Sequence, residues 1–420
     1  MRPRAALALG VLLLTLAWAA LHLPTFDRFQ IVDTPVYQEY GERMADGEVP
    51  YRDFEVEYPP GALPLFWLPT LAPQGHYVSV FEGLMWACAA AAVGFVVLGL
   101  AGVGAGPARL FAAAAFVGLA PLALGSVVLT RYDLWPAALT AAALAGFVTG
   151  RERLGFGALA LAGAAKIYPL VLLPLALVDT WRRRGAREAA LGLVVFLAVL
   201  ALVVGPFLLV APGGLWESVS GHLGRPLQIE SLGAGALLAA HQVDGSYVPS
   251  VVSTHGSQNL VGPLPDALAA TQSVLQGLAL LAVWALFARG RAGHERFLLG
   301  AAGSVVAFVA LSKVLSPQFL VWLVPVVPLV AGGAGLAGAA VLGAALVTTH
   351  LWFPTRYWDV VALEPVGWLV LVRDVLLVAL LAVLAAALAR GRRTPGEWGQ
   401  TQSHERRGSA TTFRPSAPPR

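Results

Sequence analysis

Residues 187–210, REAALGLVVFLAVLALVVGPFLLV, decide the class of this fold. After its first two residues the run is apolar, and as a helix it is long enough to cross a hydrocarbon core about 30 Å thick. The 420-residue chain as a whole is 57% hydrophobic and only 12% charged, with a mean hydropathy of +0.71. These properties predict a polytopic helical membrane protein.

Similar apolar runs predict the other crossings of the membrane. We expect spans at about 5–23, 77–100, 108–129, 133–149, 187–210, 268–288, 295–312, 317–331, 334–351 and 364–389. With re-entrant segments, this gives an all-α fold of about 10–12 helices. The runs are continuously apolar rather than alternating, which excludes strands. The first run is also compatible with a cleaved signal peptide over residues 1–23.

An acidic segment follows the first apolar run. Residues 27–60 hold nine of the 24 acidic residues of the chain, against three arginines, and also four tyrosines. Carboxylates and tyrosines gathered at a membrane surface suggest a site for polar chemistry. We therefore expect the loop at 24–60 to carry part of a functional site.

Arginine clusters at the ends of the spans predict the orientation of the chain. They lie at 2–4, 151–153, 182–187, 289–296 and 390–393, and all of them can face the cytoplasm at once. This arrangement requires residues 155–179 to enter and leave by the same face as a re-entrant pair, broken near Lys166 and Pro169. The loop at 24–60 and the long segment 212–267 then face outside the cytoplasm, and both termini face inside.

The single membrane domain is expected to cover residues 1–389. The remaining residues, 390–420, contain seven arginines and two glutamates among Pro, Ser, Thr and Gly. That composition is typical of a disordered tail, here cytoplasmic. Because the tail accounts for the net charge of +4, the partners we expect include membrane lipids but no nucleic acid.

Lysine is used sparingly. Of the 28 basic residues only Lys166 and Lys313 are lysines, and both lie within apolar segments. A buried ammonium group is costly, so a cation within the membrane is by default a functional hypothesis. Two interpretations stay open: the lysines snorkel to the outer interface, or they hold a phosphate as point charges.

Motifs of soluble enzymes are absent from the sequence. It contains no G-x-x-x-x-G-K-[ST] loop, no H-E-x-x-H, no paired C-x-x-C and no G-x-S-x-G elbow. Nucleotide hydrolysis and a cofactor are therefore not expected. Asp33, Asp53 and Glu57 could in principle gather round a divalent ion, but we favour a site without metal because several cations are already available for a phosphate.

Six short motifs follow one another along the chain. They are Val32-Asp33-x-x-Val-Tyr37, Pro50-Tyr51-x-Asp53-Phe, Glu57-Tyr58-Pro-Pro, Lys166-Ile-Tyr-Pro169, His222-x-x-Arg225-Pro-Leu-Gln-Ile-Glu230-Ser and Ser316-Pro-Gln318. Their order and topology resemble glycosyltransferase family 87, which includes bacterial mannosyltransferases that use polyprenyl-phosphate mannose. The resemblance implies a GT-C architecture, an active site outside the cytoplasm, a polyprenyl-phosphate sugar donor and no nucleotide sugar.

Such an enzyme needs a carboxylate to take the proton of the acceptor hydroxyl as it attacks the anomeric carbon. Asp33, just past the first span, lies about where the resemblance places the catalytic aspartate, and a single displacement would invert the anomeric carbon. The same residue also resembles a helix cap before residues 36–45, because Pro35 follows near the first turn. A base, a cap, or both remain possible.

Other candidates for contact with substrate lie at the end of the acidic loop. They are Asp53, Glu57 and Tyr58. The alternative for the two acids is a solvated loop, and the alternative for the tyrosine is an interfacial aromatic belt.

The departing lipid phosphate needs fixed cations around it. The candidates are Lys166, Arg225 and Lys313, with Arg131 next and with His222 and Gln318 as polar neighbours. His222 and Arg225 share one face if residues 215–225 are helical; such a helix could equally contact ordinary lipid headgroups. Arg373 and Asp374, inside the last span, form a neutralised structural pair or part of the donor pocket.

We therefore predict a membrane glycosyltransferase that moves a sugar, expected to be mannose, from a polyprenyl phosphate to a glycolipid or glycan acceptor. The alternative is a transporter or a flippase for lipids or polysaccharides, because breaks near Pro169 and Pro317 are typical of midplane transport sites. The acidic loop has no counterpart in the second half of the chain, and this asymmetry favours the enzyme.

Overall fold

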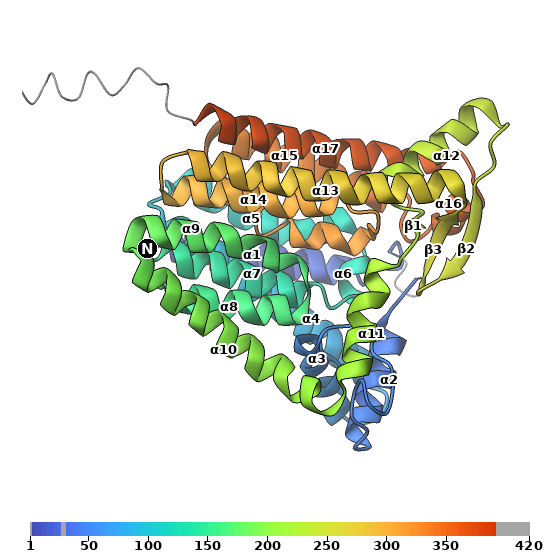
Figure 1. Ribbon diagram of the computed structural model, residues 1–420, viewed down its shortest axis with the longest axis horizontal. Helices are drawn as coiled ribbons and strands as arrows, with labels where there is room; N and C mark the ends of the chain where they lie inside the picture. Colours follow the sequence, from blue (N-terminus) through green and yellow to red (C-terminus); the bar gives the residue numbers. More distant parts are fainter. Residues whose placement is uncertain (1, 27–30, 392–420) are drawn as a thin grey trace, which may run out of the picture.

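The computed structural model describes residues 2–26 and 31–391, and at residues 222 and 223 the backbone alone. Within these ranges, seven helices are long and apolar enough to cross a membrane. They are α1 (Arg2–Ala20), α4 (Tyr77–Gly102), α5 (Pro107–Leu124), α10 (Ala186–Val210), α13 (Pro263–Arg289), α15 (Gly332–His350) and α17 (Gly367–Arg390). Most run along one direction, with α10 inclined across the others (Figure 1). The mostly helical polytopic fold is confirmed.

Four shorter helices pack among the long ones. They are α7 (Leu134–Val148), α8 (Glu152–Ala165), α9 (Leu173–Arg184) and α14 (His294–Ala310). The side chains of α7 and α14 are buried on nearly every face, as expected for helices that are apolar all round. The core of the molecule therefore sits around these two helices.

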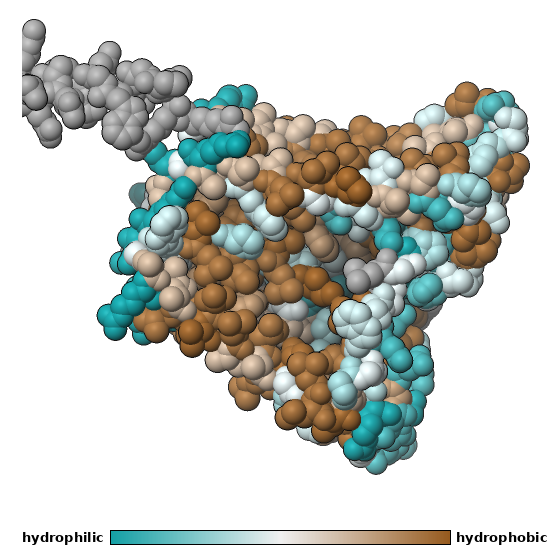
Figure 2. All heavy atoms as spheres, in the orientation of Figure 1, coloured by the Kyte–Doolittle hydropathy of each residue, from teal (hydrophilic) through white to brown (hydrophobic). Residues whose placement is uncertain are grey.

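One end of the helical bundle, called here the arginine end, is tied together by ion pairs. Arg109 pairs with Glu295 at 2.5 Å, Arg153 with Glu188 at 3.0 Å and Arg184 with Glu152 at 2.9 Å. The opposite end, called here the acidic end, carries α2 (Thr34–Ala45), α11 (Pro212–Leu223) and α12 (Leu232–Asp244) (Figure 1). Figure 2 shows hydrophilic residues towards both ends and a hydrophobic surface between them, as a membrane protein requires.

The segment α8–α9 turns back on itself. The 3₁₀ turn η3 (Tyr168–Leu172) joins the two helices, and the Glu152–Arg184 pair brings the start of α8 to the end of α9. The helices have 14 and 12 residues, fewer than the roughly 20 needed for a crossing. This is the geometry of the broken pair expected over 155–179; its entry from the cytoplasmic face remains a prediction.

The span expected at 317–331 was wrong as a continuous helix. The segment contains two 3₁₀ turns, η4 (Pro317–Trp322) and η5 (Val327–Leu329), and most of its side chains are buried. Pro325 and Pro328 explain the difference, because within an α-helix each would remove a backbone donor and clash with the preceding turn. Irregular backbone is tolerated here because protein surrounds it.

The exclusion of strands was wrong at one place, the long segment 212–267. Three antiparallel strands lie there in the order β1 (Leu227–Gln228), β3 (Ser257–Val261), β2 (Ser250–Thr254), with Thr254 opposite Ser257. His255 and Gly256 form the two-residue turn with φ of 53° and 63°, the geometry typical of a tight hairpin. Strands were excluded because the apolar runs do not alternate, and this hairpin lies between two such runs.

Short elements complete the acidic end. They are η1 (Pro60–Ala62), α3 (Leu63–Trp67), η2 (Leu68–Leu71), α6 (Val127–Thr130) and α16 (Tyr357–Val361). Gly61 allows the start of this run to touch the end of α8, because a Cβ there would lie 2.6 Å from the carbonyl carbon of Ala164. The tail beyond residue 391 lies outside the described residues.

Candidate functional site

Asp33 and Arg131 form an ion pair at the acidic end of the bundle. Asp33 occupies the N-cap position of α2, yet its side chain makes no capping hydrogen bond. The carboxylate instead pairs with Arg131 and accepts a hydrogen bond from Tyr37 Oη at 3.3 Å. The interpretation of Asp33 as a side-chain cap was therefore wrong, because the buried guanidinium competes successfully for the same oxygen atoms.

Arg131 also holds the backbone that leads into Asp33. Its Nη2 atom donates to the carbonyl of Ile31 at 2.7 Å. Ile31 has a φ of 53°, a left-handed conformation that is rare for a β-branched residue and often found at functional sites. The Arg131 side chain is 5% exposed, whereas that of Asp33 is 29% exposed. The carboxylate is thus the accessible member of a pair that is fixed from inside.

A second ion pair joins Asp133 to Lys166 at the break between α8 and α9. Asp133 Oδ1 accepts hydrogen bonds from Lys166 Nζ and from Trp322 Nε1, both at 2.7 Å. The ammonium lies 4.5 Å from the ring centroid of Tyr132 and 5.3 Å from that of Trp322. Lys166 is therefore neutralised by a buried carboxylate and enclosed by aromatic faces, a setting that favours a cation.

Aromatic rings connect the two ion pairs. The ring of Tyr58 lies 5.5 Å from that of Tyr37 and 5.1 Å from that of Tyr132, centroid to centroid. Tyr37 reaches Asp33, and Tyr132 faces Lys166. The two pairs and these tyrosines form one cluster, in which Tyr58 is a packing residue between the acidic loop and the break.

Arg225 approaches this cluster from the long segment 212–267. Both Arg225 and Arg131 lie close enough to Lys166 to act on its charge. The sequence suggested a helix over 215–225 that would carry both His222 and Arg225. The helix α11 ends at Leu223, so Arg225 lies beyond it. Its guanidinium donates instead to the carbonyl of His255 in the hairpin turn. The side chain of His222 lies outside the described part of the structure.

Lys313 and Gln318 are brought beside strand β1. The carbonyl of Lys313 accepts from the backbone nitrogen of Gln228 at 3.0 Å, and Gln228 Nε2 donates to Ser316 Oγ at 2.9 Å. The side chains of Lys313 and Gln318 are half-buried. The structure thus places the turn that contains both residues against the three-stranded sheet β1–β3–β2, called here the outer sheet. Lys166 is held separately by Asp133.

Asp53 is engaged within the acidic loop. Its carboxylate accepts hydrogen bonds from Arg52 Nη2 at 2.8 Å and from the Val49 backbone nitrogen at 2.7 Å. These hydrogen bonds lower the pKa of Asp53 to about 2. Both bonds close a tight turn, which favours a structural role for this residue. Glu57 is exposed and lines a cavity at the acidic end.

A third charged cluster lies deeper, between the outer sheet and α17. Arg373 donates to Asp374 Oδ1 at 2.6 Å and to the carbonyl of Glu230 at 2.5 Å. Both members of the Arg373–Asp374 pair are fully buried. Burial also raises the pKa of Glu230 to about 7. The neutralised structural pair is the interpretation that this geometry favours.

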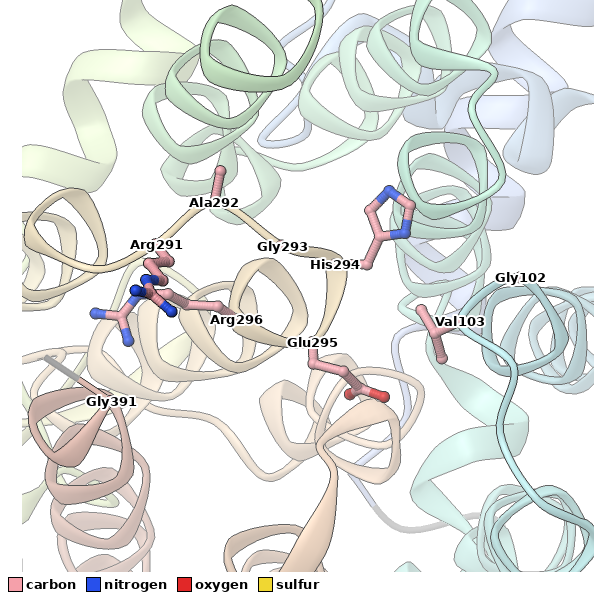
Figure 3. Close-up of a pocket in the computed structure, with 9 residues that line it drawn as sticks. All are labelled: Gly102, Val103, Arg291, Ala292, Gly293, His294, Glu295, Arg296 and Gly391. Carbon is pink, nitrogen blue, oxygen red and sulfur yellow. The ribbon is translucent and has the colours of Figure 1, made fainter. Parts of the chain in front are cut away.

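A larger cavity, of 520 Å³, opens at the arginine end (Figure 3). Arg291, His294, Glu295 and Arg296 line it. It lies at the opposite end of the bundle from Asp33 and shares no residue with the Asp33–Arg131 and Asp133–Lys166 pairs. Among the described residues, no group of three or more His, Cys, Asp or Glu is arranged to hold a metal ion.

Sequence reasoning missed Asp133 and Trp322. Asp133 was visible as the end of an Arg131-Tyr-Asp turn between apolar runs, but its partner Lys166 is 33 residues away and Trp322 is 189 residues away. A carboxylate at the edge of an apolar run, in a chain with two lysines, is the signal that could have found the pair. Trp322 had no comparable signal within its apolar run.

The described fold and site define an integral membrane protein with paired charges buried at one end of a helical bundle. The family model for glycosyltransferase family 87 matches residues 57–317. The chain belongs to glycosyltransferase family 87, and it is therefore a membrane glycosyltransferase; this membership displaces the transporter and flippase alternative. The matched region contains Arg131, Lys166, Arg225 and Lys313, but not Asp33.

No curated protein matches the chain. Among solved structures, the chain is similar to the crystal structure of ArnT from Cupriavidus metallidurans bound to undecaprenyl phosphate. The likeness has a TM-score of 0.48 at 16% sequence identity, over 91% of this chain and 77% of that chain.

Proposed function

We propose that this protein transfers a sugar, mannose, from a polyprenyl-phosphate donor to a hydroxyl group of a glycolipid or glycan acceptor outside the cytoplasm. Family membership supplies the reaction class. The observation that carries the proposal is the accessible Asp33 carboxylate, held by buried Arg131 at the acidic end of a membrane glycosyltransferase. A carboxylate fixed in this way has the geometry of a general base.

Asp33 removes the proton of the acceptor hydroxyl in this reaction. The acceptor oxygen forms a bond to the anomeric carbon while the bond from that carbon to the phosphate oxygen breaks. The proton goes to the carboxylate, and the bonding electrons leave with the lipid phosphate, so the anomeric carbon inverts. Arg131 acts as a positioning residue, because it contacts both the Asp33 carboxylate and the backbone at Ile31.

Lys166 is the best supported contact for the departing phosphate. Its ammonium has three N–H donors, and the hydrogen bond to Asp133 uses one of them. Fixed cations stabilise negative charge that grows on a leaving group, especially where water is scarce. Lys313 is proposed as a second contact from the neighbouring turn. Arg225 fits the phosphate less well, because it shares its cavity with three glutamates.

The experiment is a transfer assay with the purified protein in lipid nanodiscs. Polyprenyl phosphates carrying radiolabelled mannose, glucose or arabinose are offered with a glycolipid extract, and the products are separated from the donor. We expect loss of label from the mannose donor and its appearance in a larger glycolipid. Consumption of a nucleotide sugar, with every polyprenyl-phosphate donor left intact, would overturn the proposed donor class.

A further inference from the structure

A cavity of 190 Å³ at the acidic end plays no part in the reaction steps described above. Its walls come from the acidic loop, from α11 and from the β2–β3 turn. The polar residues that line it are Glu55, Glu57, Glu217, Ser218, Arg225 and His255. Three segments far apart in sequence thus meet around one small polar space.

Close contacts hold these three walls together. Arg225 donates to the carbonyl of His255, which ties the end of α11 to the hairpin turn. A Cβ on Gly256, in the same turn, would lie 3.9 Å from both carboxylate oxygens of Glu57. The helix α11 itself rests on the acidic loop, because Gly214 packs directly against the carbonyl of Tyr51. The cavity is therefore built by tertiary packing.

The charges around the cavity restrict its occupant. Three carboxylates face one guanidinium, so the lining repels a phosphate. The glutamates also do not form a group able to hold a metal ion within the described part of the chain. Carboxylates accept hydrogen bonds from hydroxyl groups, and arginine donates hydrogen bonds to the oxygen atoms of hydroxyl groups. A neutral polyhydroxyl group satisfies both kinds of side chain.

The size of the cavity and its position agree with that occupant. A volume of 190 Å³ equals the share of about six waters in the liquid, which suits one pyranose ring. Glu57 lies close enough to Tyr58 to act on its hydroxyl, and Tyr58 packs against Tyr37, the neighbour of Asp33. Arg225 also lies near Lys166. The cavity thus adjoins the proposed reaction centre.

We propose that this cavity is the subsite for the sugar ring of the acceptor, an inference that rests on the proposed function. A donor sugar is bonded directly to its phosphate, so placing it here would bring that anion among three carboxylates. An acceptor sugar carries hydroxyl groups alone at this point. Glu57, Glu217 and Arg225 bind these hydroxyls and present one of them towards Asp33.

A matched pair of glycine substitutions tests the site. Gly221 lines the cavity and Gly213 does not, although both lie on α11 and a Cβ on either would meet open space. Gly221→Phe should fill the cavity, and Gly213→Phe should leave it free with the same change in helix propensity. Saturation-transfer NMR with methyl α-mannopyranoside, on the full-length protein in nanodiscs, reports the binding. We expect the signal to be lost only in Gly221→Phe.

Charge substitutions and a second probe separate the acceptor from the donor. Glu217→Gln should weaken methyl α-mannopyranoside binding roughly tenfold, the effect of one lost hydrogen bond to a charged group. Any signal from mannose 1-phosphate should be unchanged by Gly221→Phe. If Gly221→Phe removes the mannose 1-phosphate signal, or if both glycine variants keep the mannoside signal, the acceptor subsite is overturned. These measurements need no turnover, so they stand apart from failure of the transfer assay.

Discussion

At the scale of single residues, the contact between Asp33 and Arg131 decides how Asp33 can act. Asp33 stands at the N-cap position of α2, but its carboxylate makes no capping hydrogen bond. Arg131, almost fully buried, instead sets the direction of the side chain and the backbone before it. A helix cap has no need of such a partner, whereas a base must be held close to one hydroxyl proton.

The Asp33→Asn substitution tests this role. Asn keeps an oxygen that can accept a hydrogen bond from Arg131 but has almost no basicity, so transfer should fall by roughly 10² to 10⁴ while the protein folds. The measurement is the rate of sugar transfer, together with the thermal unfolding temperature in detergent. Asp46→Asn is the control, because it makes the same change at an exposed position at the end of α2. Turnover of Asp33→Asn close to that of the control would remove Asp33 from the mechanism.

At the scale of structural elements, the break between α8 and α9 brings Lys166 to Asp133. Neither helix is long enough to cross the membrane alone, and the chain turns back where the lysine meets the carboxylate. Trp322 from the irregular segment 317–331 donates to the same oxygen atom. One carboxylate thus joins three non-consecutive parts of the chain, so the ion pair has a structural function besides any contact with phosphate.

This double role predicts a loss of stability in Lys166→Gln. Removing one member of a buried ion pair leaves an unpaired charge, so the variant should lose about 3–5 kcal/mol of unfolding free energy. Adding Asp133→Asn should restore most of that loss, because two neutral amides can bond to each other. Unfolding temperatures of the single and double variants form the measurement. Equal temperatures for the wild type and Lys166→Gln would show that the lysine only snorkels to the interface.

At the scale of the whole molecule, the chain separates its charges between two ends. Arginines and their acidic partners tie together one end, and the acidic loop, α11 and the outer sheet gather at the other. The hydrophobic surface lies between them (Figure 2). The rule that basic loops stay in the cytoplasm then predicts that the proposed reaction takes place at the outer face.

Cysteine accessibility tests this orientation. In a Cys88→Ala background, cysteines at Asp46 and Ser246 should react with an impermeant thiol reagent in intact cells, and a cysteine at Arg187 should react only after lysis. All three positions are exposed in the structure, so burial cannot account for protection. If only Arg187→Cys were labelled in intact cells, the predicted topology would be inverted, and Asp33 would face the cytoplasm.

From the amino-acid sequence alone, the membrane class and nearly all of the long helices can be predicted, and residues of the candidate site can be proposed. Apolar runs and prolines act locally, so their effects can be inferred from neighbouring residues. Even the failed helix at 317–331 follows from Pro325 and Pro328 in its interior. The hairpin in 212–267 was missed because short polar strands leave a weak local pattern. The tail beyond residue 391 and the side chain of His222 lie outside the described structure.

Which charged residues meet depends on tertiary packing. Arg131 lies 100 residues from Ile31 in the chain, and Trp322 lies 189 residues from Asp133. In the sequence, Asp33 could be a cap or a base, and Lys166 could snorkel to the interface or hold a phosphate. Packing pairs Asp33 with Arg131 and Lys166 with Asp133. A buried charge must find a partner to offset its lost hydration, and that partner is set by which helices lie side by side.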